Sequence, residues 1–251
     1  METRVEAKLP PENIFGHTKK LEYIRHHLKG IVQKNPTARI LDFGCGNGSA
    51  VSQHLISVLP STATYVGVDI HPESVTYANS HYRRSNATFV SSIPNDSFDA
   101  IVYADVLEHL DQPLEFLSDH HNRLVPGGTI VGSIPNGVGP FEIESWLDRR
   151  FKVSQRLATM MARIRSNGAP PIPYNSDSGH LQFYRKKEFF GILANAGFHI
   201  VEFKNGTFFG AMITERFLRV GGEPLMRANT AIAEALPFWA VSTWLFTARK
   251  A

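Results

Sequence analysis

The sequence predicts an α/β fold in which a mostly parallel sheet is covered by helices on both faces. Two observations support this class. Short apolar strands alternate with segments of helical apolar spacing along most of the chain. Alternating glycines at positions 44–48 separate one apolar strand from one helix, as in open α/β sheets that cradle a ligand. The 251 residues are enough for one large α/β domain or two small ones, and we expect a single domain over residues 1–251.

The first elements lead into the glycine turn. Apolar residues recur at helical spacing over residues 21–31, which predicts a helix. Residues 40–43 then have the composition of a buried strand. Gly44, Gly46 and Gly48 form a tight turn, because glycine lets the backbone bend sharply and a ligand approach closely. We expect a helix to open at Ser49 and to be closed by Pro60.

The next strands bring polar residues to one edge of the sheet. The second strand covers residues 64–70 and carries Asp69 at its carboxyl end, where parallel sheets bind ligands. A helix over 72–83 and a short strand over 88–90 follow. The fourth strand, residues 97–104, is apolar on both faces, as a central parallel strand should be.

The second half of the chain continues this alternation with two interruptions. Asp111 as cap and Pro113 in the first turn predict the start of the next helix. The insertion at 137–180 is basic and amphipathic and follows the fifth strand, so we expect it to form a substrate lid. A second variable segment covers residues 206–236. The other expected elements are a Pro-Gly-Gly turn with the fifth strand (124–136), a helix (186–196) ended by Gly197, and strands over 198–203 and 241–249.

Composition limits the classes of function and location. The net charge of +3 and a pI of about 9.0 are too diffuse to indicate nucleic acid as a partner. Cys45 is the only cysteine, so no disulfide forms within the chain. The N-terminal residues 1–13 lack an apolar signal region, and the most apolar run, 235–247, is too short for a membrane span. We therefore expect a cytoplasmic location and no transmembrane span; a homo-oligomer is left open.

The spacing of the glycines separates two kinds of cofactor site. The dinucleotide fingerprint would place its third glycine at position 49, where this chain has Ser49, and the third glycine is Gly48 instead. A nicotinamide-dependent oxidoreductase is therefore disfavoured. Asp42 also precedes the first glycine by two residues, where a carboxylate could face an amino-bearing ligand. This D-x-G-x-G-x-G pattern resembles motif I of the class I S-adenosylmethionine-dependent methyltransferases.

Two further stretches carry the same resemblance. The run FDAIVYADVLEHL, residues 98–110, resembles the subgroup of ubiquinone-biosynthesis O-methyltransferases and small-RNA 2′-O-methyltransferases. The run LVPGGTIVGSIPN, residues 124–136, matches the next landmark of the family. The resemblance implies a Rossmann-like, mostly parallel seven-stranded sheet whose last strand is antiparallel. It also implies S-adenosylmethionine as cofactor, with S-adenosylhomocysteine as product.

The resemblance assigns a cofactor site at the carboxyl ends of the strands. In the family, the acidic residue at the position of Asp69 binds the ribose, and the apolar residue at Ile70 packs on the adenine. Ser91 and Ser92 stand where the family often has an acidic residue near the adenine. The cofactor-binding residues that we expect are Asp42, Gly44, Gly46, Gly48, Asp69, Ile70, Ser91, Ser92, Ala104 and Asp105.

Two histidines are the candidate catalytic residues. His109 follows the fourth strand and His180 ends the insertion, and histidine is the usual base for a hydroxyl nucleophile. In the related subgroup, residues matching Asp105, Glu108, His109 and His180 hold a divalent cation. We expect direct histidine catalysis ahead of a metal, because Asp105 is shorter than the family's usual glutamate and because the Glu-His pair also occurs in relatives without a metal.

The expected function is methyl transfer to a small-molecule or lipid-like acceptor, with oxygen as the expected acceptor atom. One alternative is RNA 2′-O-methylation, which the lack of a clustered basic and aromatic face disfavours. Another is a non-catalytic methyltransferase-like binding module, which the intact glycine turn and Asp69 disfavour.

Overall fold

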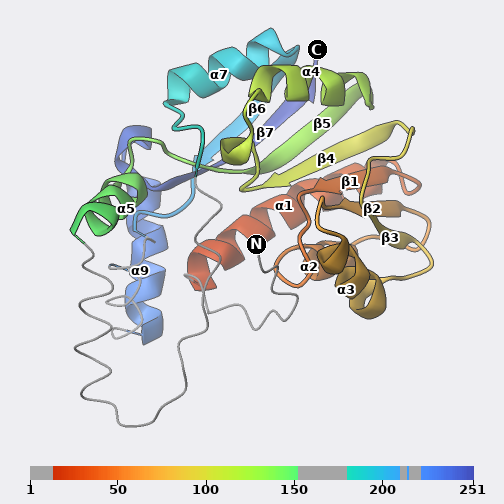
Figure 1. Ribbon diagram of the computed structural model, residues 1–251, viewed down its shortest axis with the longest axis horizontal. Coiled ribbons are helices and arrows are strands. Elements are labelled where there is room, and N and C mark those ends of the chain that lie inside the picture. Colours follow the sequence, from red (N-terminus) through yellow and green to blue (C-terminus); the bar gives the residue numbers. More distant parts are fainter. Residues whose placement is uncertain (1–13, 152–179, 210–213, 215–221) are drawn as a thin grey trace.

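The computed structural model describes residues 14–151, 180–209, 214 and 222–251, which form a seven-stranded sheet with helices on both faces (Figure 1). The strand order is β3-β2-β1-β4-β5-β7-β6. The strands are β1 (Arg39–Phe43), β2 (Thr64–Val68), β3 (Ala87–Val90), β4 (Phe98–Ala104), β5 (Leu124–Pro135), β6 (Phe198–Asn205) and β7 (Thr243–Lys250). The helices include α1 (Ile14–Lys34), α2 (Ser52–Ile56), α3 (Pro72–Tyr82), α4 (Pro113–Asn122), α5 (Pro140–Phe151), α7 (Lys186–Asn195) and α9 (Gly222–Ala235).

The pairing of the strands confirms the predicted fold class. Strands β3, β2, β1, β4 and β5 pair in parallel, and β7 pairs antiparallel with both β5 and β6. The chain passes from β1 outward through β2 and β3, then returns to the other side of β1 as β4. This reversal is the switch point of an open α/β sheet, where ligands bind at the carboxyl ends of the strands.

Two apolar cores hold the helices on opposite faces of the sheet. One core joins α4 and α7 to the sheet and contains large buried side chains such as Tyr103, Phe189 and Trp244. The other joins α1, α2 and α3 to the opposite face and contains Ile24 and Leu55. Central strands are buried on both faces, as their continuous apolar sequence predicts.

Two local details differ from the sequence-based expectation. The helix after the glycine turn is short, because the Asn47 side chain accepts bonds from the backbone and hydroxyl of Ser49 and holds residues 49–51 in turns. The cap of α4 is Gln112, so the prediction of Asp111 was wrong. The physical reason is that Pro113 restricts the preceding residue to extended backbone, which places the boundary one residue later.

The Pro-Gly-Gly sequence forms a bulge within β5. Phe98 pairs with Leu124 and Ala100 pairs with Thr129, so residues 125–128 loop out between them. Gly127 adopts a φ of 73° there, a conformation that glycine accepts without strain.

The predicted lid is described only in its first part. Helix α5 begins at Pro140 and lies beyond the end of β5, at the left of Figure 1. Residues 152–179, which carry the rest of the predicted lid, lie outside the described residues, as do parts of the second variable segment. In the described part of the chain, no helix has the length and apolar character needed to cross a membrane.

Candidate functional site

The glycine turn after β1 is built from three residues with left-handed backbone. Gly44, Gly46 and Gly48 have φ values of 71°, 56° and 79°. A Cβ on Gly44 would lie 2.8 Å from Val106, and one on Gly48 would lie 2.9 Å from Tyr82, so close packing excludes side chains at both positions. A Cβ on Gly46 would meet no atom within 4 Å. Gly46 therefore leaves open space above the turn, into which a ligand can approach the backbone.

Asp69 ties the turn to the end of β2. One carboxylate oxygen accepts a hydrogen bond from the Gly46 amide at 2.8 Å, and the other accepts from the His71 amide at 2.9 Å. The side chain is half-buried, and the next residue, Ile70, is 75% exposed. An exposed isoleucine beside a carboxylate matches the expected packing surface for adenine next to a ribose contact. These two contacts stay predictions.

Asp42 lies inside the protein and supports the turn from below. Its carboxylate is 1% exposed and accepts hydrogen bonds from the Ser52 hydroxyl at 2.8 Å and from the Tyr65 hydroxyl. Burial raises the pKa of Asp42 to about 6, and the two hydroxyl bonds oppose that rise. Both donors that this carboxylate contacts come from the chain itself. Direct cofactor contact by Asp42 stays a prediction.

The other expected cofactor residues lie at the same edge of the sheet. Ser91 and Ser92 follow β3 and are exposed, and Ala104 ends β4 in a half-buried position. Asp105 has a φ of 58°, which aspartate tolerates better than most residues. Its carboxylate pairs with the Lys20 ammonium at 2.5 Å and accepts a hydrogen bond from the Ser133 hydroxyl.

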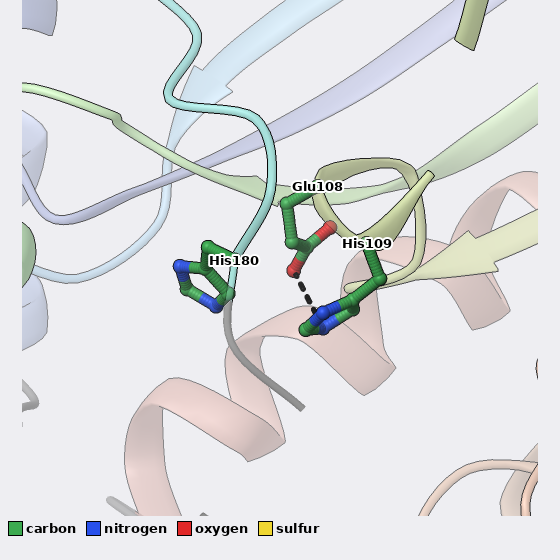
Figure 2. Close-up of side chains that lie close together, drawn as sticks. All are labelled: Glu108, His109 and His180. Atoms are coloured by element: carbon green, nitrogen blue, oxygen red, sulfur yellow. Dashed lines mark ion pairs between the residues drawn. The ribbon is translucent and has the colours of Figure 1, made fainter. Parts of the chain in front are cut away.

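Glu108, His109 and His180 converge just beyond β4. The first two lie on the short 3-10 helix Leu107–His109, and His180 begins the segment that leads to α7. Their ligand-capable atoms all lie within 4.8 Å of one another, and the two imidazole rings are 5.2 Å apart between centroids. In Figure 2 the Glu108 carboxylate points into the space between the two rings. The sequence prediction that the two histidines approach each other is confirmed.

Backbone hydrogen bonds hold His180 in this position. The amides of Leu181 and Gln182 both donate to the carbonyl of Glu108 at 2.9 Å. The Tyr184 hydroxyl donates to the carbonyl of Leu107 at 3.1 Å. The segment after the predicted lid is thereby fixed along the 3-10 helix, which brings residues 71 positions apart in sequence into one cluster.

Glu108 is a buried carboxyl group without a hydrogen-bond partner. Its side chain is 1% exposed, and neither oxygen has a partner among the described residues. The Nε2 of the His109 ring lies 3.9 Å from one of these oxygens. Burial raises the pKa of Glu108 well above its usual value, and the negative charge of Asp105 raises it further. A buried carboxylate is costly because it has lost its water shell, and either a bound cation or a proton would offset this cost.

Asp105, the fourth residue suggested for a cation, is not part of this group of possible ligands. The group of possible ligands in the described part of the chain contains Glu108, His109 and His180 alone. Asp105 instead pairs with Lys20 on α1. At the end of β4 the Asp105 carboxylate thus bridges α1 and β5 through Lys20 and Ser133.

The structure adds Glu142, which sequence reasoning missed as a site residue. Its carboxylate lies 2.5 Å from Nδ1 of His180, and its side chain is 7% exposed. The sequence places Glu142 near the start of a helix, 38 residues before His180, and no motif links the two positions. Only the return of the chain past β5 brings them together.

Comparison with known proteins identifies the family. The methyltransferase-domain family matches residues 16–203, which include the glycine turn, Asp69 and all three clustered side chains. The chain belongs to this methyltransferase family. The resemblance to class I S-adenosylmethionine-dependent methyltransferases is thus confirmed, with S-adenosylmethionine as the cofactor.

Curated relatives match part of this chain. It is 32% identical over 110 residues to a ubiquinone biosynthesis O-methyltransferase of Xanthomonas campestris pv. campestris strain B100, covering 40% of this chain and 44% of that protein. It is 28% identical over 133 residues to a protein of the same name from Cereibacter sphaeroides strain ATCC 17025, covering 47% and 52%. The chain spans about half the length of the curated relatives that it matches.

Solved structures share the fold over most of the chain. Magnesium protoporphyrin IX methyltransferase from Synechocystis PCC 6803, solved with SAH (S-adenosylhomocysteine) bound, has a TM-score of 0.57 at 14% identity, covering 98% of this chain and 88% of that one. A methyltransferase from Mesorhizobium loti has a TM-score of 0.56 at 16% identity, covering 90% and 96%. At these identities the likeness shows the fold alone.

Proposed function

We propose that this protein transfers a methyl group from S-adenosylmethionine to a hydroxyl of a small, apolar or lipid-like acceptor. The observation that carries the proposal is the convergence of Glu108, His109 and His180 beyond the carboxyl end of β4. The names of the curated relatives support oxygen as the acceptor atom. S-adenosylmethionine supplies the reactive methyl as part of a sulfonium.

The chain's main task in this proposal is alignment. Asp69 binds the ribose, Ile70 packs on the adenine, and Gly46 lets the cofactor approach the backbone. Lys20 and Asp105 form a pair of opposite charges at the end of β4. The methionine end of the cofactor carries an ammonium and a carboxylate. Asp105 can bind the ammonium and Lys20 can bind the carboxylate. The acceptor oxygen then attacks the methyl carbon as the bond to sulfur breaks, and alignment lowers the barrier to this displacement.

The clustered side chains fit a divalent cation. The two partnerless Glu108 oxygens are buried where a positive charge would offset their desolvation, and two imidazoles supply neutral nitrogen ligands. Ligand atoms on one Mg²⁺ lie no more than about 4.2 Å apart. The present separations of up to 4.8 Å would therefore close by roughly half an ångström. A cation held there would supply Lewis acidity, which lowers the pKa of a bound hydroxyl.

Without a cation, the same geometry makes a histidine the base. The Glu142 carboxylate occupies Nδ1 of His180, so Nε2 is the nitrogen left to take the acceptor's proton. His109 lies against this ring and offers a second imidazole. Chelation distinguishes these two versions of the mechanism.

Exposed apolar side chains beside His180 favour an apolar acceptor. Leu181 is 54% exposed and Phe183 is 46% exposed, and both lie in the segment fixed along the 3-10 helix. On α5, Ile143 and Trp146 are also exposed. We propose that the 137–180 insertion covers the acceptor, because its described part already carries Glu142 to the site.

The test is methyl transfer from labelled S-adenosylmethionine to a panel of acceptors. The panel contains an alkylated catechol, an alkylated aniline of similar size, and a short single-stranded RNA. Methyl ether formation on the catechol alone is the expected result. Transfer to the RNA 2′-oxygen would establish the alternative activity, and binding of S-adenosylhomocysteine without transfer to any acceptor would favour a binding module.

A further inference from the structure

The imidazole of His180 is held by a buried carboxylate that belongs to neither the glycine turn nor the three-residue cluster. Glu142 lies in the first turn of α5, and its Oε1 is 2.5 Å from Nδ1 of His180. The side chains of the two residues are 7% and 18% exposed, so water competes little for this contact. Phe141 stacks on the same ring, with 5.8 Å between centroids and an interplanar angle of 27°.

The path of the chain makes this contact specific. After β5, the Gly137 amide donates to the carbonyl of Tyr184 at 2.9 Å. A Cβ on Gly137 would lie 2.1 Å from the backbone of Phe183, so only glycine lets the two segments run this close. The crossing brings the start of α5 beside His180. The start of a helix also favours a carboxylate, because the helix dipole is positive there.

We infer that Glu142 is a positioning residue that fixes His180 in the Nδ1–H tautomer and turns its Nε2 lone pair toward Glu108 and His109. A carboxylate oxygen accepts this hydrogen bond, so the shared proton lies on Nδ1 of His180. The hydrogen bond at one imidazole nitrogen sets which nitrogen is free to bind a metal or a proton. The catalytic purpose of this tautomer rests on the proposed function. The tautomer itself does not, because it forms without cofactor or acceptor.

The inference separates orientation from chemistry within the site. His180 would touch the acceptor or a cation, whereas Glu142 acts only through His180. A carboxylate that orients a ligating histidine typically contributes about 10- to 100-fold to metal affinity. Of the other carboxylates on α5, Glu144 is also buried but accepts from the backbone and hydroxyl of Thr214 at 2.7 and 2.6 Å. It is therefore a matched control on the same helix.

The experiment measures the His180 tautomer by ¹⁵N NMR of the imidazole in the cofactor-free protein, with His180→Gln used to assign its signals. The wild type should show a protonated Nδ1 and a bare Nε2. Glu142→Gln should keep this pattern, because an amide oxygen still accepts from Nδ1. Glu142→Leu should lose it and exchange between tautomers, whereas Glu144→Leu should retain it.

Binding of Mn²⁺ alone, followed by electron paramagnetic resonance, gives a second readout. Glu142→Leu should bind Mn²⁺ about 10- to 100-fold more weakly than Glu144→Leu. A protonated Nε2 in the wild type, or an unchanged tautomer in folded Glu142→Leu, would overturn the inference. Because the wild-type spectrum alone can do so, the test does not depend on whether the variants fold. Failure of methyl transfer with the predicted tautomer intact would instead count against the proposed function.

Discussion

Replacing Gly46 by alanine should separate cofactor binding from folding. The added Cβ meets no atom of the folded chain within 4 Å, so it causes no clash inside the protein. It projects into the open space where the cofactor is proposed to approach the turn. The substitution should therefore weaken cofactor binding far more than it disturbs the packing of the protein.

The structure sets the size of both effects. Gly46 has a φ of 56°. Placing alanine in this left-handed conformation should lower the free energy of unfolding by roughly 1–2 kcal/mol. Forcing one extra methyl into an occupied site costs about 1–3 kcal/mol. We therefore expect S-adenosylhomocysteine to bind roughly 5- to 150-fold more weakly, since each 1.4 kcal/mol is a tenfold change in affinity.

Gly127→Ala is the matched control. Gly127 has a φ of 73°, and its Cβ would also meet nothing within 4 Å, but it lies in the β5 bulge at the opposite end of the strands. Calorimetry with S-adenosylhomocysteine and urea unfolding should show equal losses of stability in the two variants and a loss of affinity only in Gly46→Ala. Normal affinity in folded Gly46→Ala would refute the assignment of this turn as the cofactor cradle.

Three other measurements test separate parts of the proposal, and a fourth tests the stability of the fold. Asp69→Ala should weaken S-adenosylhomocysteine binding by about 1.5–3 kcal/mol per lost charged hydrogen bond, and unchanged calorimetric affinity would remove Asp69 from the site. EDTA should stop methyl transfer and Mg²⁺ or Mn²⁺ should restore it; full activity in EDTA would leave a histidine as the base. Hydrogen exchange in α5 should slow when cofactor and acceptor are both bound, and equal protection would contradict a covering role. Burial lowers the pKa of His120 to about 4, against about 6.5 in the unfolded chain. The free energy of unfolding should therefore rise with pH between these two values, by up to roughly 3 kcal/mol. In urea unfolding, His120→Gln should lose this pH dependence.

The local order of elements could be predicted because each carries its own signal. Apolar spacing located the strands and most helices, and alternating glycines located the turn whose three left-handed residues the structure contains. Gly197 was predicted to end a helix, and it follows α7 with a φ of 86°. These signals depend on residues close in sequence, which a single sequence displays directly.

Contacts between distant segments could not be predicted in the same way. The sequence motif contains an aspartate at position 42 whether its side chain faces a ligand or the interior. The hydrogen bonds from the Tyr65 and Ser52 hydroxyls show that it faces the interior. Glu142 reaches His180 because Gly137 lets two loops pack closely, and nothing near Glu142 in the sequence reports this. The convergence of the two histidines was predicted from family motifs rather than from local physics.

The central claim is that the cofactor lies on the glycine turn with its sulfur facing Glu108, His109 and His180. A crystal structure with S-adenosylhomocysteine and Mn²⁺ bound, with anomalous scattering to locate sulfur and manganese, tests this claim most directly. We predict the ligand sulfur above the carboxyl ends of β1 and β4, with the manganese peak among the three side chains. A ligand bound elsewhere, or with its sulfur turned away from these side chains, would contradict the account.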